Sequence, residues 1–262
     1  LGFFNLQVVE LGKFFLMFFV AGYLQKYRNE ISKNSLHVLT LMVVLAVYCL
    51  LIIQQPDLGS AAVIFVSCLA VLFIAGMRMK LFVVLAIISI FALIWFVVME
   101  PFRLERLLTF INPWKVPFDA GYQLVQALIE FGRAGWLGLG LGEGVQKLYY
   151  LPEAHNDFIF AVIVEELGFV GAVSFIALYS CFVWLIFSIA KKSLERGDFF
   201  GGYSCFFAGF LFAFQFLINV GVNSGLLPTK GLTLPLISYG GSSLIVSCML
   251  LGILLRASVA KD

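Results

Sequence analysis

The sequence predicts an all-α integral membrane protein, a polytopic bundle of transmembrane helices. Its 262 residues are 62% hydrophobic and only 12% charged, and the mean hydropathy is +1.03. Soluble domains are about 45–50% apolar and about 25% charged, so this composition excludes an ordinary soluble fold. The apolar residues also gather in runs that approach the roughly 20 residues needed to cross a bilayer. We expect residues 1–262 to form one transmembrane domain.

Seven apolar runs are the candidate spans, and in chain order they are roughly 8–25, 36–53, 60–76, 81–99, 157–190, 199–221 and 234–256. The fifth run is longer than a bilayer requires, so we expect its helix to tilt or to extend past the membrane. Glycines within the later runs suit close helix packing.

Lys and Arg gather in the connections after the first, third, fifth and seventh runs. Basic loops remain on the cytoplasmic side, so this alternation predicts a cytoplasmic C-terminus. The connections 54–59, 100–156 and 222–233 then face outside. Leu1 is also placed outside, and no signal peptide precedes the first run. We therefore expect an odd number of additional spans before Leu1.

Composition also limits the classes of partner and cofactor. The net charge of +2 gives no reason to expect a nucleic acid. The five cysteines all fall within apolar runs, where a thiol behaves as a small hydrophobic group. No spacing of Cys and His predicts a metal site or a disulfide framework.

The outer connection 100–156 contains a stretch, 121–134, with helical periodicity. Gln123, Gln126, Glu130 and Arg133 recur at steps of three and four, so they share one helix face. Two interpretations stay open. The helix lies on the membrane surface with a solvated polar face, or this face points toward a substrate.

Two glycine-containing turns have structural explanations. Residues 138–144, GLGLGEG, lack the register of a phosphate-binding loop, so we expect a mobile outer loop. In the turn 54–60, Pro56 and Gly59 interrupt the helix, and Asp57 is a good N-cap for the third span.

The stretch 226–243, LLPTKGLTLPLISYGGSS, places helix breakers at membrane depth; they are Pro228, Gly231, Pro235, Gly240 and Gly241. Irregular backbone survives at that depth only where protein covers it or where it lines a wet cavity. Lys230 in this stretch either snorkels to the surface or faces a phosphate-bearing lipid. The length of the broken stretch favours the functional interpretation.

A polar cluster lies directly before the fifth run, and it comprises Glu153, His155, Asn156 and Asp157. Asp157 is followed at once by Phe-Ile-Phe, so its carboxylate lies near the membrane surface. Ionisable groups there are costly to desolvate and are usually functional. The alternative is that Asn156 or Asp157 only caps the fifth helix.

Glu165 and Glu166 lie two turns deeper in the same run. Carboxylates at that depth need partners or water. Candidate partners among the outer residues are Arg106, Arg133, Lys147 and His155. An ion-pair network that only fixes the helices is the structural alternative.

Several stretches together resemble the SEDS family (shape, elongation, division and sporulation), especially its cell-division branch, FtsW. They are QPDLGS at 55–60, EPFRLERLLTFINPW at 100–114, GYQLVQAL at 121–128, QKLYYLPEAHNDFIFAVIVEELG at 146–168 and NVGVNSGLLPTKGLTLPLISYGGSS at 219–243. The lysine in PTKGLT is similar to the division branch rather than to the elongation branch, RodA. One departure is Gln7-Val8-Val9-Glu10, where the family usually reads Gln-Pro-Ser/Ala-Glu.

This resemblance implies ten spans with both ends cytoplasmic, so about three N-terminal spans would precede Leu1. It implies a peptidoglycan glycosyltransferase that polymerises lipid II at the outer face of the bacterial cytoplasmic membrane, at the division septum. Undecaprenyl pyrophosphate would be the leaving group. The implied partners are a class B penicillin-binding protein and other membrane proteins of the division complex, with no nucleic acid. The family's essential aspartate falls at Asp157.

The expected site therefore has Asp157 as its catalytic base. The candidate substrate-binding residues are Arg106, Arg133, Lys230, His155, Glu153, Gln123, Gln126, Ser238 and Tyr239. No protein-bound metal is predicted, although a divalent cation, Mg²⁺ or Mn²⁺, is a candidate cofactor at a pyrophosphate. Two other functions remain open, a transporter that flips lipid II and a non-catalytic division scaffold.

Overall fold

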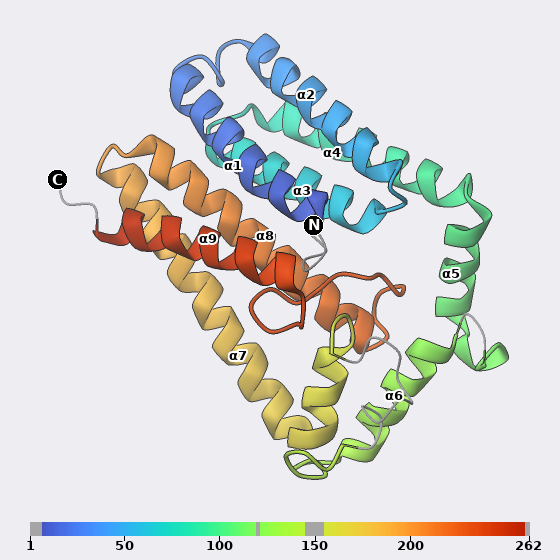
Figure 1. The fold of residues 1–262 in the computed structure, drawn as a ribbon. Helices are drawn as coiled ribbons and strands as arrows, with labels where there is room; N and C mark the ends of the chain where they lie inside the picture. Colours follow the sequence, from blue (N-terminus) through green and yellow to red (C-terminus); the bar gives the residue numbers. More distant parts are fainter. Residues whose placement is uncertain (1–6, 119–120, 145–154, 260–262) are drawn as a thin grey trace, which may run out of the picture. The chain divides into compact units, whose positions relative to one another are not determined.

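The computed structural model describes residues 7–118, 121–144 and 155–259, and within these ranges it contains helices and no strand (Figure 1). Six helices are long and apolar enough to cross a membrane: α1 (Val8–Tyr27), α2 (Ser35–Ile53), α4 (Met79–Val98), α7 (Ile159–Glu195), α8 (Phe199–Asn223) and α9 (Gly241–Val259). The predicted all-α class is confirmed, and each of these helices overlaps a predicted apolar run.

The third predicted run forms a shorter helix, so the count of seven spans is not confirmed. Helix α3 (Leu58–Ile74) has 17 residues. At about 1.5 Å per residue it is shorter than the roughly 30 Å hydrocarbon core. Its predicted cap is confirmed, because Asp57 Oδ1 accepts a hydrogen bond from the Ser60 N–H at 2.9 Å.

The seventh predicted run was wrong at its start. We expected a helix from residue 234, but α9 begins only at Gly241. Residues 224–240 are irregular, as the prolines and glycines of the broken stretch predicted. Proline lacks a backbone donor, so a continuous helix through this stretch would lose hydrogen bonds.

Helix α7 is not the single tilted or extended helix that its length suggested. Its backbone leaves the helical region at Gly168, where φ is 71° and ψ is −168°. Figure 1 shows the result as a short first segment and a long second segment that meet at a sharp bend. Only glycine reaches this backbone conformation without steric cost.

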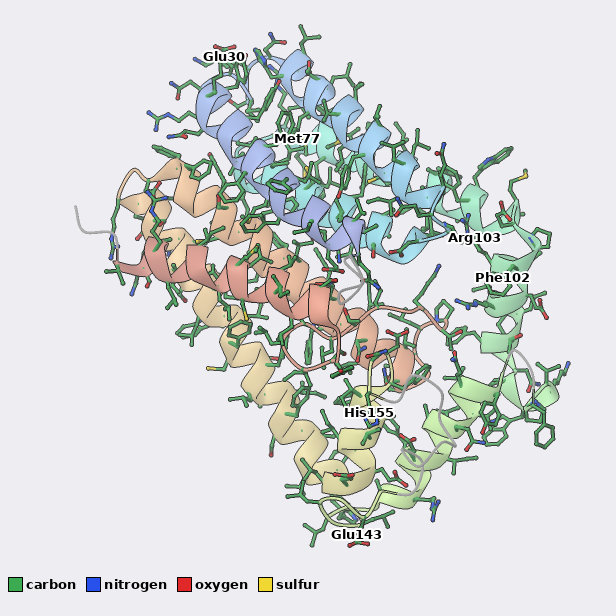
Figure 2. All side chains as sticks on the ribbon, in the orientation of Figure 1. Glu30, Met77, Phe102, Arg103, Glu143 and His155 are labelled. Carbon is green, nitrogen blue, oxygen red and sulfur yellow. The ribbon has the colours of Figure 1, made fainter. Side chains whose placement is uncertain are left out.

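The connection between α4 and α7 contains two helices and a turn. Helix α5 (Pro101–Ile111) is followed by the 3-10 turn η1 (Pro113–Lys115) and by α6 (Tyr122–Ala134). The helix predicted over 121–134 is therefore confirmed. The side chains of Phe102 and Arg103 lie on α5 in Figure 2, and the Arg103 guanidinium donates to the Phe96 carbonyl at 3.0 Å.

The chain divides into two compact units. Unit 1 comprises residues 1–91, 182–214 and 241–262, and unit 2 comprises residues 92–181 and 215–240. Within unit 1, α3 packs against α1 and α2, and α1 also packs against α9. Every predicted site residue belongs to unit 2.

One hydrophobic cluster of unit 2 joins α6, the start of α7 and the end of α8. Its buried members are Ala127, Phe158, Ala161, Val162 and Val222, with Phe131 and Ile218 packed against them. Aromatic stacking adds to this core, since the rings of Tyr179 and Phe216 are parallel with centroids 4.2 Å apart. The core thereby fixes the turn that precedes α7.

Candidate functional site

The candidate site is centred on the turn 155–158 at the start of α7. Phe158 is buried in the core, whereas His155 is exposed and Asp157 is half-buried. Figure 2 shows His155 at this turn. The buried phenylalanine anchors the turn, and the carboxylate one residue earlier remains partly accessible.

The carbonyl groups of three consecutive residues in this turn are all held by later parts of the chain. The hydrogen bonds run from Tyr239 N–H to His155 O (2.9 Å), from Ser238 Oγ to Asn156 O (2.6 Å), and from Asn219 Nδ2 and Asn223 Nδ2 to Asp157 O (2.9 Å each). Backbone groups buried away from water need such partners. The backbone that carries Asp157 is therefore fixed by α8 and by the irregular stretch 224–240.

Helix α8 also supplies a cap for α7. Asn223 Oδ1 accepts a hydrogen bond from the Ala161 N–H at 3.0 Å. The first N–H groups of a helix have no partner within the helix and are often satisfied by side chains. The sequence pointed to Asn156 or Asp157 for this role, and it did not identify a cap donated by a distant helix.

Gly231 brings the irregular stretch against the candidate base. A Cβ atom at Gly231 would lie 3.0 Å from Asp157 Oδ2. A side chain there would press on the carboxylate, so the absence of one allows the close approach. The neighbouring Lys230 is half-buried in the same stretch.

Ser238 and Tyr239 both bind backbone groups of the site. The Ser238 hydroxyl accepts from the Leu234 N–H at 2.7 Å and donates to the Asn156 carbonyl. Its side chain is buried and shapes the turn. Tyr239 donates its N–H to His155, while its side chain is 84% exposed.

The predicted residues on α5 and α6 have other surroundings. The Arg106 guanidinium lies over the Phe102 ring, 4.4 Å from its centroid. Arg133 is exposed in the last turn of α6, and Gln123 and Gln126 are half-buried on the same helix. Their predicted contacts with substrate stay predictions.

Glu153 and Lys147 lie outside the described residues. Among the residues that the structure does describe, no group of three or more His, Cys, Asp or Glu side chains could hold a metal ion. The divalent cation therefore stays a prediction.

Glu130 does not fit the solvated polar face, which was one of the two interpretations left open for 121–134. Its side chain is fully buried, and neither carboxyl oxygen has a hydrogen-bond partner among the described residues. Burial, with a smaller contribution from the nearby Glu165, raises the pKa of Glu130 to about 8. Desolvation disfavours the charged form, so the group is largely protonated at neutral pH.

The glycine-rich loop after α6 is bound to the bend in α7, contrary to the mobile loop that we expected. Four backbone hydrogen bonds join the two: Leu139 N–H to Glu165 O (2.9 Å), Gly140 N–H to Glu166 O (3.1 Å), Phe169 N–H to Gly135 O (3.0 Å) and Val170 N–H to Trp136 O (3.1 Å). The Gly142 N–H also donates to Glu166 Oε2 at 3.1 Å. The loop thus satisfies the polar groups that the bend at Gly168 exposes.

Sequence reasoning missed three residues of the site, namely Asn219, Asn223 and Gly231 as contacts of Asp157. A signal was present for the two asparagines, because amides four residues apart in an apolar run share one helix face. No local pattern could show which carbonyl they bind. The glycine was identified only as a helix breaker.

A family model decides the classification. The model of the cell cycle protein family FTSW_RODA_SPOVE matches residues 1–262. The chain belongs to this family. The resemblance to SEDS proteins that the sequence stretches suggested is thereby confirmed.

Curated members of the FTSW_RODA_SPOVE family match along nearly the whole chain. The protein named probable peptidoglycan glycosyltransferase FtsW of Pseudoalteromonas translucida is 46% identical over 98% of this chain. A protein of the same name from Coxiella burnetii is 44% identical over 100% of it. The chain spans 64% of the length of the first relative and 70% of the second.

Two solved structures are similar to this chain over nearly its whole length. A chain from a peptidoglycan synthase complex that coordinates polymerization and crosslinking matches 98% of this chain, with a TM-score of 0.76 and 29% identity. The rod shape determining protein RodA of Thermus thermophilus matches 99%, with a TM-score of 0.65 and 29% identity. This chain covers 71% and 68% of those two chains. It is a multi-pass membrane protein of the family.

Proposed function

We propose that this chain forms part of a peptidoglycan glycosyltransferase that polymerises lipid II into glycan strands during cell division. The observation that carries the proposal is the half-buried Asp157 on a backbone held at three consecutive carbonyls. The relative named probable peptidoglycan glycosyltransferase FtsW, at 46% identity, supports the same activity.

The proposed reaction is a single displacement with Asp157 as general base. The 4-hydroxyl of the acceptor sugar transfers its proton to the Asp157 carboxylate while its oxygen bonds to the anomeric carbon of the donor strand. The bond from that carbon to undecaprenyl pyrophosphate breaks, and the pyrophosphate takes the electron pair. One displacement inverts the anomeric centre. A well-placed base contributes about 10²–10⁴-fold.

Positive charge would stabilise the departing pyrophosphate. Lys230 is the leading candidate, because the neighbouring Gly231 lies against Asp157. Arg106 and Arg133 are further candidates on α5 and α6. The described residues offer no protein cage for Mg²⁺ or Mn²⁺, so such an ion would depend mainly on phosphate oxygens, and no step of this mechanism requires it.

A class B penicillin-binding protein is the proposed partner, and it would cross-link the strands that this protein makes. The solved complex that coordinates polymerization and crosslinking supports this pairing. We place the reaction at the outer face of the bacterial cytoplasmic membrane at the division septum, with the C-terminus in the cytoplasm. The basic connections of the sequence support that orientation.

The test is Asp157→Asn in the full-length protein, assayed for lipid II polymerisation in detergent with its cross-linking partner. We expect a loss of about 10²-fold or more, because the amide cannot accept the proton. Asp57→Asn is a matched control that removes a carboxylate from a helix cap, where asparagine caps equally well. Its activity should match wild type.

Polymerisation at the wild-type rate by folded Asp157→Asn would refute the assignment of the base. The same assay separates the enzyme from a transporter, and a cell-division assay separates it from a scaffold. A transporter needs two compartments and makes no glycan in detergent. A scaffold would support division with Asp157→Asn as well as with the wild-type residue.

A further inference from the structure

Two asparagines near the end of α8 are buried within a mostly apolar helix. Asn219 is 2% exposed and Asn223 is fully buried. They are four residues apart, so both side chains lie on one face of the helix. A buried amide is costly unless its N–H and carbonyl groups are paired, and the cost rises in a membrane protein where water is scarce.

Their hydrogen bonds converge on the candidate base. Asn219 Nδ2 donates to the carbonyls of Asp157 and Leu232, at 2.9 Å each. Asn223 Nδ2 donates to the carbonyls of Asp157 and Asn219, at 2.9 and 2.8 Å, while its Oδ1 accepts from the Ala161 N–H. Both amides therefore use their two N–H groups on backbone carbonyls.

This pattern requires an amide. Asn223 must donate on one side and accept on the other, and only an amide of this length offers both. An aspartate would turn a carboxylate oxygen toward two carbonyl oxygens. A leucine of similar size would remove the hydrogen bonds from this residue to the carbonyls of Asp157 and Asn219.

These hydrogen bonds hold backbone groups in and around the turn that contains Asp157. The asparagines hold its own carbonyl, the first-turn N–H of Ala161, and the Leu232 carbonyl, which is next to Gly231. Gly231 in turn lies against Asp157 Oδ2. The backbone of a residue sets the direction of its Cα–Cβ bond, so holding these groups fixes the point from which the carboxylate extends, and Gly231 leaves room for Oδ2 on one side.

We propose that Asn219 and Asn223 are positioning residues that aim the Asp157 carboxylate at the reacting hydroxyl. The inference rests on the proposed glycosyltransferase function and adds residues that touch neither substrate nor reacting atoms. A general base works only within hydrogen-bond reach of its proton, so misplacement by about 1 Å can cost about 10²-fold in rate.

The experiment compares Asn223→Leu and Asn223→Asp with Gln215→Leu in the full-length protein and its partner. Gln215 is a buried amide on the same face of α8, two turns before Asn223. We expect kcat for lipid II polymerisation to fall about 10²-fold in both Asn223 variants, with KM changed less than about twofold. Gln215→Leu should keep the wild-type kcat.

A second measurement does not depend on activity. Hydrogen–deuterium exchange of the segment 155–162 should be about tenfold faster in Asn223→Leu than in wild type, and unchanged in Gln215→Leu. If Asn223→Leu does not fold, Asn219→Ser keeps a hydroxyl donor in a shorter side chain and takes its place.

Wild-type kcat and wild-type exchange in a folded Asn variant would overturn the inference, as would a defect confined to KM. These outcomes are distinct from failure of the proposed function. That failure appears as an active Asp157→Asn variant, whereas failure of this inference leaves Asp157→Asn inactive and the asparagine variants active.

Discussion

Glu130 is an ionisable residue whose side chain is fully buried. A fully buried carboxyl group with no hydrogen-bond partner among the described residues would normally be destabilising when ionised. Burial raises its pKa from 4.5 to about 8, so at neutral pH the group is mostly neutral. The proton therefore relieves most of the penalty.

This shift predicts that stability falls as pH rises. The folded state retains a proton that the unfolded state releases between the two pKa values, so unfolding becomes easier from about pH 4.5 to pH 8 and then levels off. Each pKa unit corresponds to about 1.4 kcal/mol. Glu130→Gln should remove this dependence and raise the thermal midpoint most at pH 8 and above.

Thermal unfolding in detergent between pH 5 and pH 9 measures the effect. Glu143→Gln is the control, because Glu143 is exposed on the loop that follows α6. An unchanged pH profile in Glu130→Gln would show that Glu130 is ionised in the fold.

At the scale of elements, the bend in α7 and the loop after α6 are held together by backbone hydrogen bonds. Gly138 and Gly168 both have positive φ, and their backbones are in close contact where the loop packs against the bend. A Cβ atom at Gly138 would stand 2.2 Å from the Glu166 carbonyl oxygen. Contact this close between backbones leaves no room for any side chain.

We therefore expect Gly138→Ala to destabilise the protein by about 2–4 kcal/mol, because it combines a clash with an unfavourable backbone angle. Gly142→Ala separates the two causes, since φ there is +85° but no atom lies within 4 Å of the added Cβ. That variant should lose only about 1 kcal/mol. Equal losses in chemical denaturation would refute the steric part of this explanation.

The sequence predicted the helices better than their interruptions. Apolar runs located the six long helices because a helix that crosses lipid needs about 20 mostly apolar residues in succession, which the sequence shows directly. The break at Gly168 was missed because hydrophobicity continues across it on both sides. The late start of α9 was missed for the same reason, since residues 234–240 are apolar enough to extend the run although Pro235 and Gly240 interrupt the helix.

At the scale of the whole molecule, the orientation in the membrane is a further prediction. The basic connections place residue 118 outside and residue 196 inside. In a cysteine-free background, a membrane-impermeant maleimide should label Phe118→Cys in intact cells and Arg196→Cys only after permeabilisation. The reverse pattern would invert the topology and place Asp157 on the cytoplasmic side.

The candidate site was only partly predictable. Asp157 was identified from its place at the edge of an apolar run and from the family resemblance. Its partners were not, because Asn219, Asn223 and Ser238 bind backbone groups 62 to 82 residues earlier in the chain. Backbone carbonyls are present at every residue, so no sequence pattern shows which one an amide will bind.

The order of the chain has a consequence for synthesis. The turn that carries Asp157 is translated long before the donors that fix it, the last of which is Tyr239. When the first segment of α7 has been synthesised, the donors that hold the backbone of Asp157 have therefore not yet been made. Under the mechanism proposed above, the hydrogen bonds that position Asp157 therefore form only after the segment that follows α8 has been synthesised.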